Sequence, residues 1–301
     1  MTTEVTQHRS AVKRSLRPRA GRAVFYAVLS LAAFAMVVPF LWMVLTSLKS
    51  SAEVNSFTWL PTELHWENYS DAMSAAPFLT YFRNSFVLAI SQTLLAIVFA
   101  TAAGYALAKL PIPGKKYLLW YVIALLMVPF QVVIVPLFLV VKSIPLAGGN
   151  DILGQGGSGW LDTWWGLIVP LAMGPLFIFL SRQFFTSLPS ELAEAARIDG
   201  VSEYGIFGRI MLPMVKPALV TIAVFQIEAA WNSFLWPLIV TSSPDLRPLQ
   251  LGLAIFSQDE LNVQWNYLMA GATLATVPMI ILFIVAQKYF VQGLASSGLK
   301  G

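Results

Sequence analysis

Six long apolar stretches constrain this chain more than any other feature of its sequence. They cover residues 23–48, 82–108, 117–141, 161–184, 217–240 and 267–289. A lipid core about 30 Å thick needs roughly 20 apolar residues for each helical crossing. Each stretch is long enough to cross as a helix, and none shows the ten-residue alternation of a membrane β-barrel. The sequence therefore predicts an all-α polytopic membrane protein with six transmembrane helices.

The composition agrees with a lipid-embedded chain and excludes several other classes. Of all residues, 57% are hydrophobic and 11% are charged, whereas a soluble domain carries roughly a quarter charged residues. This apolar content excludes intrinsic disorder. The absence of cysteine excludes a disulfide framework.

Basic residues are concentrated in alternate connections between the six stretches. The N-terminal tail, the second and fourth connections and the C-terminal segment hold 15 of the 19 Lys and Arg residues. Because basic segments remain on the cytoplasmic side, both termini are predicted to be cytoplasmic. This gives a basic cytoplasmic tail over residues 1–22 and a transmembrane domain over residues 23–301, with a cytoplasmic loop at 185–216. The first stretch is too long for a cleaved signal peptide and is interpreted as an uncleaved signal anchor.

Two stretches carry patterns that indicate close packing and a broken helix. The second repeats small residues every four positions: Ala96, Ala100, Gly104 and Ala108. Such a ridge lets another backbone approach closely, either as an interface that slides or as static bundle packing. The third contains Pro129, Gln131 and Pro136. Because proline frees backbone carbonyls, which are tolerated at this depth only against protein or a water-filled cavity, a broken helix beside a pathway is predicted.

Glu228 is the one ionisable residue well inside an apolar stretch. It lies about 12 residues beyond Lys216, roughly 18 Å along a helix and near mid-membrane. A charged carboxylate there costs on the order of 3 kcal/mol, so it must face protein, water or a ligand, or stay protonated. Trp231 and Asn232 share its helix face. Together these groups could hold a polyhydroxylated ligand; a structural hydrogen bond to a neighbouring helix is the alternative.

The fourth connection contains two short predicted helices. In the first, Pro189 suits the opening turn, Glu191 and Glu194 complement the positive end of the helix dipole, and Gly200 supplies the stop. One shallow face, suited to close docking of a partner, is predicted to hold Leu192, Ala195, Ala196 and Asp199.

The second helix of this connection is predicted to begin after Ser202 as its N-cap and to end before Pro213. Its aligned apolar residues are Tyr204, Phe207 and Met211. Together with Arg182 just before it, the loop carries four acidic and four basic residues, which weakens attraction to anionic lipid and favours docking of a protein.

Several short motifs resemble those of a known family. Glu194-Ala195-Ala196, Asp199-Gly200 and Leu212-Pro213 resemble the EAA loop of ABC-type importer permeases. From about residue 40 to the end, further motifs are similar to those of maltose-type carbohydrate permeases: Leu60-Pro61, Glu67-Asn68-Tyr69, Arg83-Asn84-Ser85, Trp231-Asn232 with Trp236-Pro237, and Gln292-Gly293-Leu294 with Lys300-Gly301.

The resemblance implies one permease subunit of an ATP-driven importer in a bacterial plasma membrane. The solute would be a sugar, from a mono- to an oligosaccharide, delivered by an extracytoplasmic solute-binding protein. Implied partners are a second, different permease subunit and two ATPase subunits that hold ATP and Mg²⁺, with membrane lipid around the spans. No cofactor, metal or nucleic acid is expected in this chain. It has no P-loop and is not expected to be an enzyme.

The matched motifs place the family's roles on particular residues. Residues expected to couple to the ATPases are Glu191, Glu194, Ala195, Ala196, Asp199, Gly200, Leu212 and Pro213. The expected substrate pathway comprises Asn84, Trp231 and Asn232 from these motifs, and Gln131 and Glu228 from the broken third stretch and the intramembrane carboxylate described above. The sequence departs from the family at two positions, because Ser233 stands where an acid usually follows Trp-Asn and Glu228 is acidic where no acid is expected. The substrate can therefore differ from a plain disaccharide.

Three alternatives remain open at this point. A permease for glycerol-3-phosphate or a related phosphodiester would need basic pathway residues, and only Arg83 lies near a span mouth. An ion-coupled secondary transporter could use Glu228 as a proton relay, but such carriers show internal repeats. A membrane enzyme would need clustered catalytic residues, whereas the two histidines, His8 and His65, lie in the tail and an outer connection.

Overall fold

The computed structural model describes residues 19–56, 58–257 and 264–297, and this part of the chain contains helices and no strand. Most of the predicted basic tail and the closing Lys300-Gly301 lie outside the described residues. The longest helices are α1 (Arg19–Ser47), α4 (Phe78–Lys109) and α15 (Trp265–Ser297). Further helices of the bundle are α5 (Lys115–Leu126), α6 (Phe130–Lys142), α7 (Trp164–Ala172), α8 (Pro175–Ser187), α12 (Lys216–Trp231) and α13 (Leu235–Val240). Short elements are α2 (Ser51–Val54), α3 (Glu67–Ala75), α9 (Glu191–Ile198), α10 (Glu203–Gly205), η1 (Ile206–Met211), α11 (Leu212–Met214), η2 (Pro244–Leu246) and α14 (Leu249–Phe256).

Among the described residues, three helices are individually long and apolar enough to cross a membrane. They are α1 from Gly21 onward, α4, and α15 as far as Gln287. Three bent helix pairs meet the same criterion if each pair is counted as one crossing, which gives up to six. The pairs join α5 to α6 at 107°, α7 to α8 at 43°, and the helix over Glu203–Met214 to α12 at 79°.

Proline explains where the apolar stretches break. The predicted break in the third stretch is confirmed, since α5 ends before Pro129 and α6 begins after it. The fourth and fifth stretches, which also contain prolines, are divided in the structure as well. Pro175 opens α8 and cannot donate to the preceding turn, while Pro237 inside α13 cannot donate to Ser233. A continuous helix is therefore interrupted ahead of each proline.

Helix α4 lies at the centre of the bundle, against α8 and α12 along its length. Its small-residue ridge is buried, because Ala96 and Ala100 pack with Phe177 of α8 and Ile222 of α12. Gly104 continues the ridge against Ser181 of α8. In this structure the ridge is therefore used for packing within the chain.

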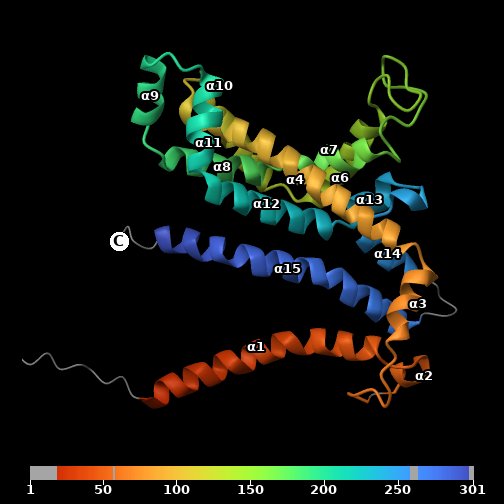
Figure 1. Ribbon diagram of the computed structural model, residues 1–301. Coiled ribbons are helices and arrows are strands. Elements are labelled where there is room, and N and C mark those ends of the chain that lie inside the picture. Colours follow the sequence, from red (N-terminus) through yellow and green to blue (C-terminus); the bar gives the residue numbers. More distant parts are fainter. Residues whose placement is uncertain (1–18, 57, 258–263, 298–301) are drawn as a thin grey trace, which may run out of the picture.

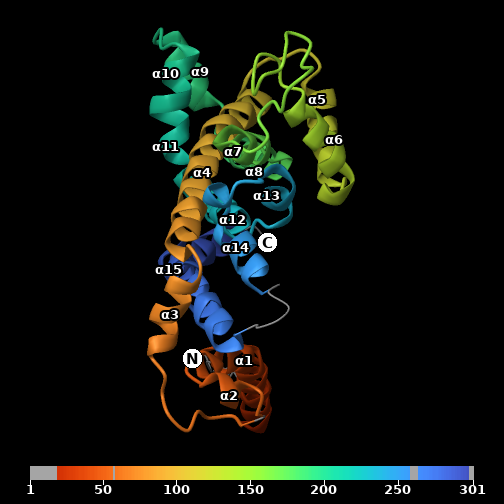
Figure 2. The same ribbon diagram turned by 90° about the vertical axis from the view of Figure 1, so that its right-hand side faces the viewer.

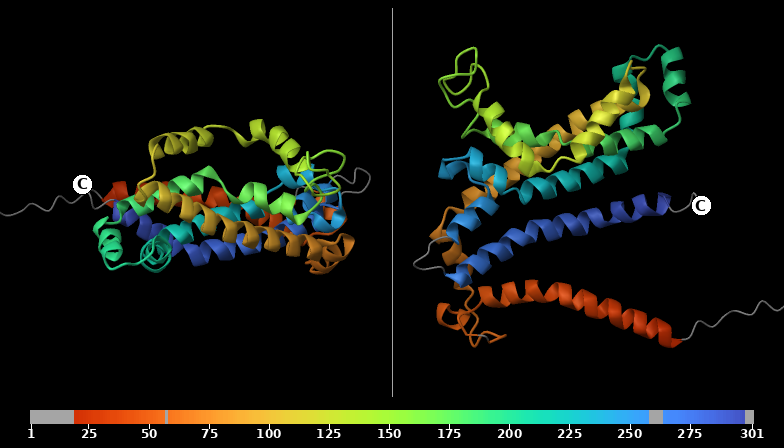
Figure 3. Two further views of the ribbon diagram at one scale, coloured as in Figure 1. Left: turned by 90° about the horizontal axis from the view of Figure 1, so that it is seen from above. Right: turned by 180° about the vertical axis from the view of Figure 1, so that it is seen from behind.

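The remaining long helices surround this centre unevenly (Figure 1). Helix α1 contacts α15 towards its C-terminal end, whereas residues 21–37 are exposed. Figure 2 shows α5 and α6 on one side of α4, away from α1. The start of α1, the end of α15 and the α9–α11 segment all lie at one end of the molecule, as Figures 1 and 3 both show. We call this the α9 end, and the opposite end, which holds α2, α3, α13 and α14, the α14 end.

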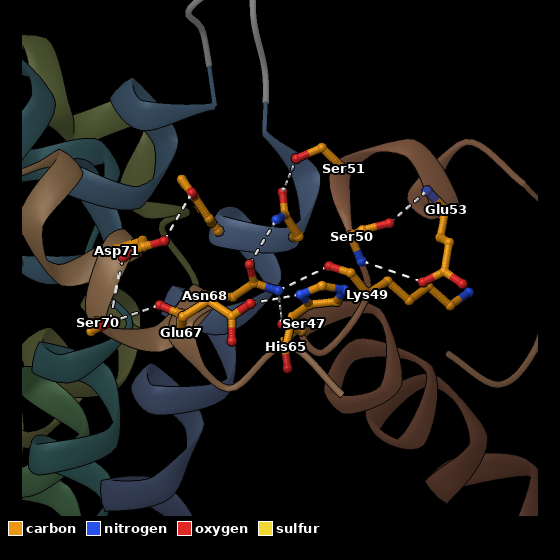
Figure 4. A network of polar contacts seen from close by, with 12 residues as sticks. Ser47, Lys49, Ser50, Ser51, Glu53, His65, Glu67, Asn68, Ser70 and Asp71 are labelled. Carbon is orange, nitrogen blue, oxygen red and sulfur yellow. Dashed lines mark hydrogen bonds and ion pairs between the residues drawn. The ribbon is translucent and has the colours of Figure 1, made fainter. Parts of the chain in front are cut away.

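A polar network fixes α1 to the bundle at the α14 end (Figure 4). The side-chain amide of Asn68 donates to the backbone oxygens of Ser47 and Lys49, at 2.8 and 2.9 Å. Asn266 of α15 donates in turn to the Asn68 side-chain oxygen at 3.0 Å. Nearby, the Glu67 carboxylate accepts a hydrogen bond from His65 and raises the pKa of that imidazole. Asn68, which belongs to the Glu67-Asn68-Tyr69 motif, therefore joins α1, α3 and α15.

Gly104→Ala tests the close approach of α4 and α8. A Cβ at Gly104 would lie 2.5 Å from the Ser181 Oγ and 2.7 Å from the Arg182 backbone nitrogen. We expect the free energy of unfolding to fall by about 1–3 kcal/mol, seen as a lower thermal midpoint of the detergent-solubilised protein. Gly21→Ala is the matched control, because a Cβ at Gly21 meets no atom within 4 Å. Equal midpoints for the two variants would contradict this packing.

Candidate functional site

The segment between α8 and α12, residues 188–215, projects from the bundle at the α9 end (Figure 1). Its first helix, α9, begins after Ser190, and Glu191 and Glu194 lie in its first turn as predicted. It ends at Ile198, two residues before Gly200, whose φ is +77°. Glycine adopts this left-handed conformation without the steric cost of a Cβ, so Gly200 makes the turn between the two halves of the segment.

The faces of α9 differ from the prediction at one residue. Ala193 and Ala196 point inward, where they pack with Ile206 and Met211. Ala196 is only 6% exposed, so its predicted place on the docking face with Leu192, Ala195 and Asp199 is wrong. Residues three apart share a helix face. The face that holds Ala193 and Ala196 is buried because it packs against η1.

The outward face of the segment is a mixture of carboxylates and apolar side chains. Its predicted members that are exposed are Glu191, Leu192, Glu194, Ala195, Asp199 and Gly200. Two further residues were missed, since Ile198 is 87% and Tyr204 is 90% exposed. Large apolar side chains that remain this exposed are typical of an interaction surface. We call this set of eight residues the docking face.

The second half of the segment contains an unusual helical turn. Ser202 caps it as predicted, accepting a hydrogen bond from the Gly205 amide at 3.3 Å. Tyr204 does not align with the buried Met211. Pro213 lies inside α11 rather than beyond the helix end, because η1 is a π-helical turn in which the Leu212 amide donates to Phe207. Leu212 and Pro213 therefore lead into the 79° bend before α12.

A first cavity, of about 580 Å³, lies between α1, α12, α14 and α15. Its polar residues are Glu228, Asn232, Gln250 and Thr276, and the rest of its lining is apolar. The Asn232 amide donates to the Glu228 carboxylate at 2.9 Å, and Gln250 donates to the Asn232 side-chain oxygen at 3.4 Å. Glu228 thus has a hydrogen-bond partner on its own helix and faces a cavity.

A second cavity, of about 460 Å³, lies between α4, α6, α8, α12 and α13. Its polar lining residues are Gln92, Gln131, Gln226, Asn232 and Ser233. Its apolar lining residues are Phe130, Leu171, Phe177, Ala229, Phe234, Leu235 and Trp236. None of these residues is charged. The breaks between α5 and α6, α7 and α8, and α12 and α13 all border this cavity.

Two glutamines of the second cavity were not singled out from the sequence. The Gln226 amide donates to Gln92 at 2.8 Å, and the Gln92 amide donates to the Leu167 backbone oxygen at 3.0 Å. Their polarity inside apolar stretches is visible in the sequence. The pairing depends on α4 and α12 lying side by side, which the sequence does not reveal.

The predicted pathway residues therefore separate into two groups. Gln131, Glu228 and Asn232 line the cavities, whereas Asn84 and Trp231 line neither of them. Asn84 is 1% exposed and donates to the backbone oxygens of Asp245 and Arg247. Trp231 is 2% exposed and donates to the Ala275 backbone oxygen at 3.1 Å. Within the described ranges, no three His, Asp or Glu side chains converge as a metal ion would require.

Trp231→Phe tests the assignment of this ring to the core. The substitution leaves the buried Ala275 carbonyl without its indole donor, and we expect the free energy of unfolding to fall by about 1 kcal/mol. Thermal unfolding in detergent measures the change. Trp165→Phe, at a ring that is 63% exposed, should leave the midpoint in place, and an unaltered midpoint for Trp231→Phe would contradict the assignment.

Comparison with known proteins gives a consistent result. A family model described as "Binding-protein-dependent transport system inner membrane component" matches residues 96–296. The arabinooligosaccharides transport system permease protein AraQ of Halalkalibacterium halodurans is 36% identical over 274 residues, which cover 89% of this chain and 93% of that protein.

Two solved structures share the fold. One is a chain of a bacterial ABC transporter involved in the import of the acidic polysaccharide alginate, with a TM-score of 0.79, 24% identity and coverage of 91% of this chain and 98% of that one. The other comes from a bacterial alginate ABC transporter in complex with an alginate pentasaccharide-bound periplasmic protein. It has a TM-score of 0.62, 12% identity and coverage of 88% and 93%.

Proposed function

Because this chain belongs to the family of binding-protein-dependent transport system inner membrane components, as a permease of sugar-import ABC transporters, we propose that its second cavity forms part of the path of a neutral sugar. The observation that carries this proposal is the cavity lining. Carboxamides both donate and accept hydrogen bonds, as hydroxyl groups require. Aromatic rings beside them suit the apolar faces of a sugar. The three helix breaks described above border the same cavity.

The same lining separates the proposed substrate from the alternatives. A phosphate ester would be expected to meet Lys or Arg, and neither lines either cavity. A proton-coupled carrier would need a chain of ionisable groups, whereas Glu228 is the one ionisable residue among the two linings. AraQ is named for arabinooligosaccharides, which favours a neutral oligosaccharide for this chain as well.

The proposed orientation places the α9 end in the cytoplasm of a bacterial cell. The ends of α1 and α15 and the α9–α11 segment lie together there (Figure 3), and the basic connections adjoin this end. A positive-inside distribution supports this direction and six crossings. ATP and Mg²⁺ would bind to two separate ATPase subunits that contact the docking face.

A complete importer would also contain a second permease subunit and an extracytoplasmic solute-binding protein. A related fold occurs in a complex with a periplasmic protein, which supports the second of these partners. The exposed flank of α1 offers apolar surface to lipid or to the second permease. ATP-driven closure of the ATPases would then bias the spans between inward and outward states.

Gly200→Asp tests the docking face in the membrane-reconstituted importer. We expect ATP-dependent uptake to fall by about tenfold or more at normal abundance, because the substitution adds strain and a side chain at the exposed turn. The matched control is Gly114→Asp, since Gly114 has a similar φ of +72° in another connection and a Cβ there would make only an ordinary contact, at 3.8 Å, with the Tyr117 ring. Equal uptake by the two variants would count decisively against docking at this turn.

Glu228→Gln tests the contribution of the first cavity to recognition. The variant keeps a partner for Asn232 but removes the ionisable carboxyl group, and we expect the KM for the sugar carried by the co-encoded solute-binding protein to change by about threefold to tenfold. Glu63→Gln, at an exposed loop position, serves as the control. Identical uptake kinetics in both variants would assign Glu228 a purely structural role.

A further inference from the structure

We propose that α4 transmits movement of the docking face to the α14 end, through a polar clasp at each of its ends. The inference rests on the proposed function, because it assumes that ATPase subunits pull on the docking face. It adds a route for the force and assigns positioning roles to Tyr105, Glu203 and Asn84.

The first clasp joins the docking segment to the last turns of α4. The Glu203 carboxylate accepts one hydrogen bond from the Arg197 guanidinium of α9 and another from the Tyr105 hydroxyl of α4, the latter at 2.9 Å. Lys109 of α4 donates to the Leu188 backbone oxygen at 2.6 Å. Both halves of the segment are thus bonded to one helix that is distant in sequence.

Aromatic packing reinforces this clasp from the inner side. The Tyr105 ring lies 5.5 Å from that of Phe185 and 5.2 Å from that of Phe207, measured between centroids. These separations are typical of favourable aromatic pairs. Because the inner face is held against α4 while the docking face is exposed, displacement of α9 draws α4 with it.

The second clasp lies at the opposite end of α4. The Asn84 amide donates to the backbone oxygens of Asp245 and Arg247 at 2.7 and 2.9 Å, and the Ser85 hydroxyl accepts from the Leu249 amide at 2.8 Å. These bonds hold η2 and the start of α14. Gln250 of α14 contacts Asn232 in the first cavity, so a shift of α14 reaches a cavity-lining residue.

The connection between the clasps is a continuous helix. α4 has 32 residues and no internal proline, whereas α1 contains Pro39 and α15 contains Pro278. Asn84 and Tyr105 are 21 positions apart, about 30 Å along the axis. By contrast, the segment joins α12 through a 79° bend, and bent junctions absorb rotation. α4 is therefore the stiffer route.

The test uses the whole importer, reconstituted in proteoliposomes with its co-encoded second permease, ATPases and solute-binding protein. Tyr105→Phe removes one hydrogen bond and keeps the ring, and Asn84→Ala opens the distant clasp. We expect both variants to retain bound ATPases and basal ATP hydrolysis, while stimulation of hydrolysis by the binding protein falls by about tenfold. Tyr121→Phe, at an exposed tyrosine of α5, is the matched control and should remain stimulated.

The experiment distinguishes failure of the proposed function from failure of the clasps alone. A wild-type complex without ATP-dependent uptake overturns the proposed function and the clasps with it. Normal wild-type uptake together with undiminished stimulation of Tyr105→Phe and Asn84→Ala overturns the clasps alone. Loss of ATPase binding by Tyr105→Phe also overturns them, because the contact would then serve docking rather than transmission.

A rescue experiment adds an independent readout. The chain contains no cysteine, so Tyr105→Cys combined with Glu203→Cys can be bridged selectively by a short bifunctional thiol reagent in cysteine-free partners. Without the bridge, stimulation should be lost; with the bridge, it should return. A bridged complex that remains unstimulated overturns the proposal.

Discussion

A backbone inside lipid must satisfy its own hydrogen bonds, and this constraint governs the rest of the structure. Where proline removes a donor, the freed carbonyls need protein or water beside them. The three helix breaks all border one cavity, which is lined by Phe130, Leu171 and Asn232 close to the breaks. The interrupted helices and the polar cavity are therefore linked, because the freed backbone carbonyls need polar partners or water beside them.

The same constraint explains how polar side chains are distributed in the bundle. Gln92 and Gln226 bond to each other, and Asn84 bonds to two backbone oxygens. A buried amide without a partner would cost about 1–3 kcal/mol, so such pairs favour one arrangement of the helices over others. Asn68 has this role at the α14 end, where hydrogen bonds between Ser47 and Tyr69 and between Tyr267 and Asp71 also join the helices α1, α3 and α15.

Features of the structure that depend on residues close together in the sequence could be predicted, whereas features that depend on contacts between distant segments could not. The break at Pro129, the cap at Ser202 and the turn at Gly200 follow from local chemistry, and the structure has all three. The burial of Ala196 and Trp231 depends on which neighbouring element covers a helix face, and the predictions for these residues rest on periodicity alone. The role of Asn84 requires knowing that residues 245 and 247 fold back onto α4, a separation of more than 160 positions.

The absence of charge from the lining of the second cavity also has an electrical consequence. The membrane potential acts on charge, at about 2.3 kcal/mol per elementary charge moved through 100 mV. Carboxamides and aromatic rings carry none, so rearranging this lining moves no fixed charge across the field. The neutral sugar proposed above would need no counter-ion beside Gln92 and Gln226, and at this cavity the voltage would neither assist nor oppose its passage.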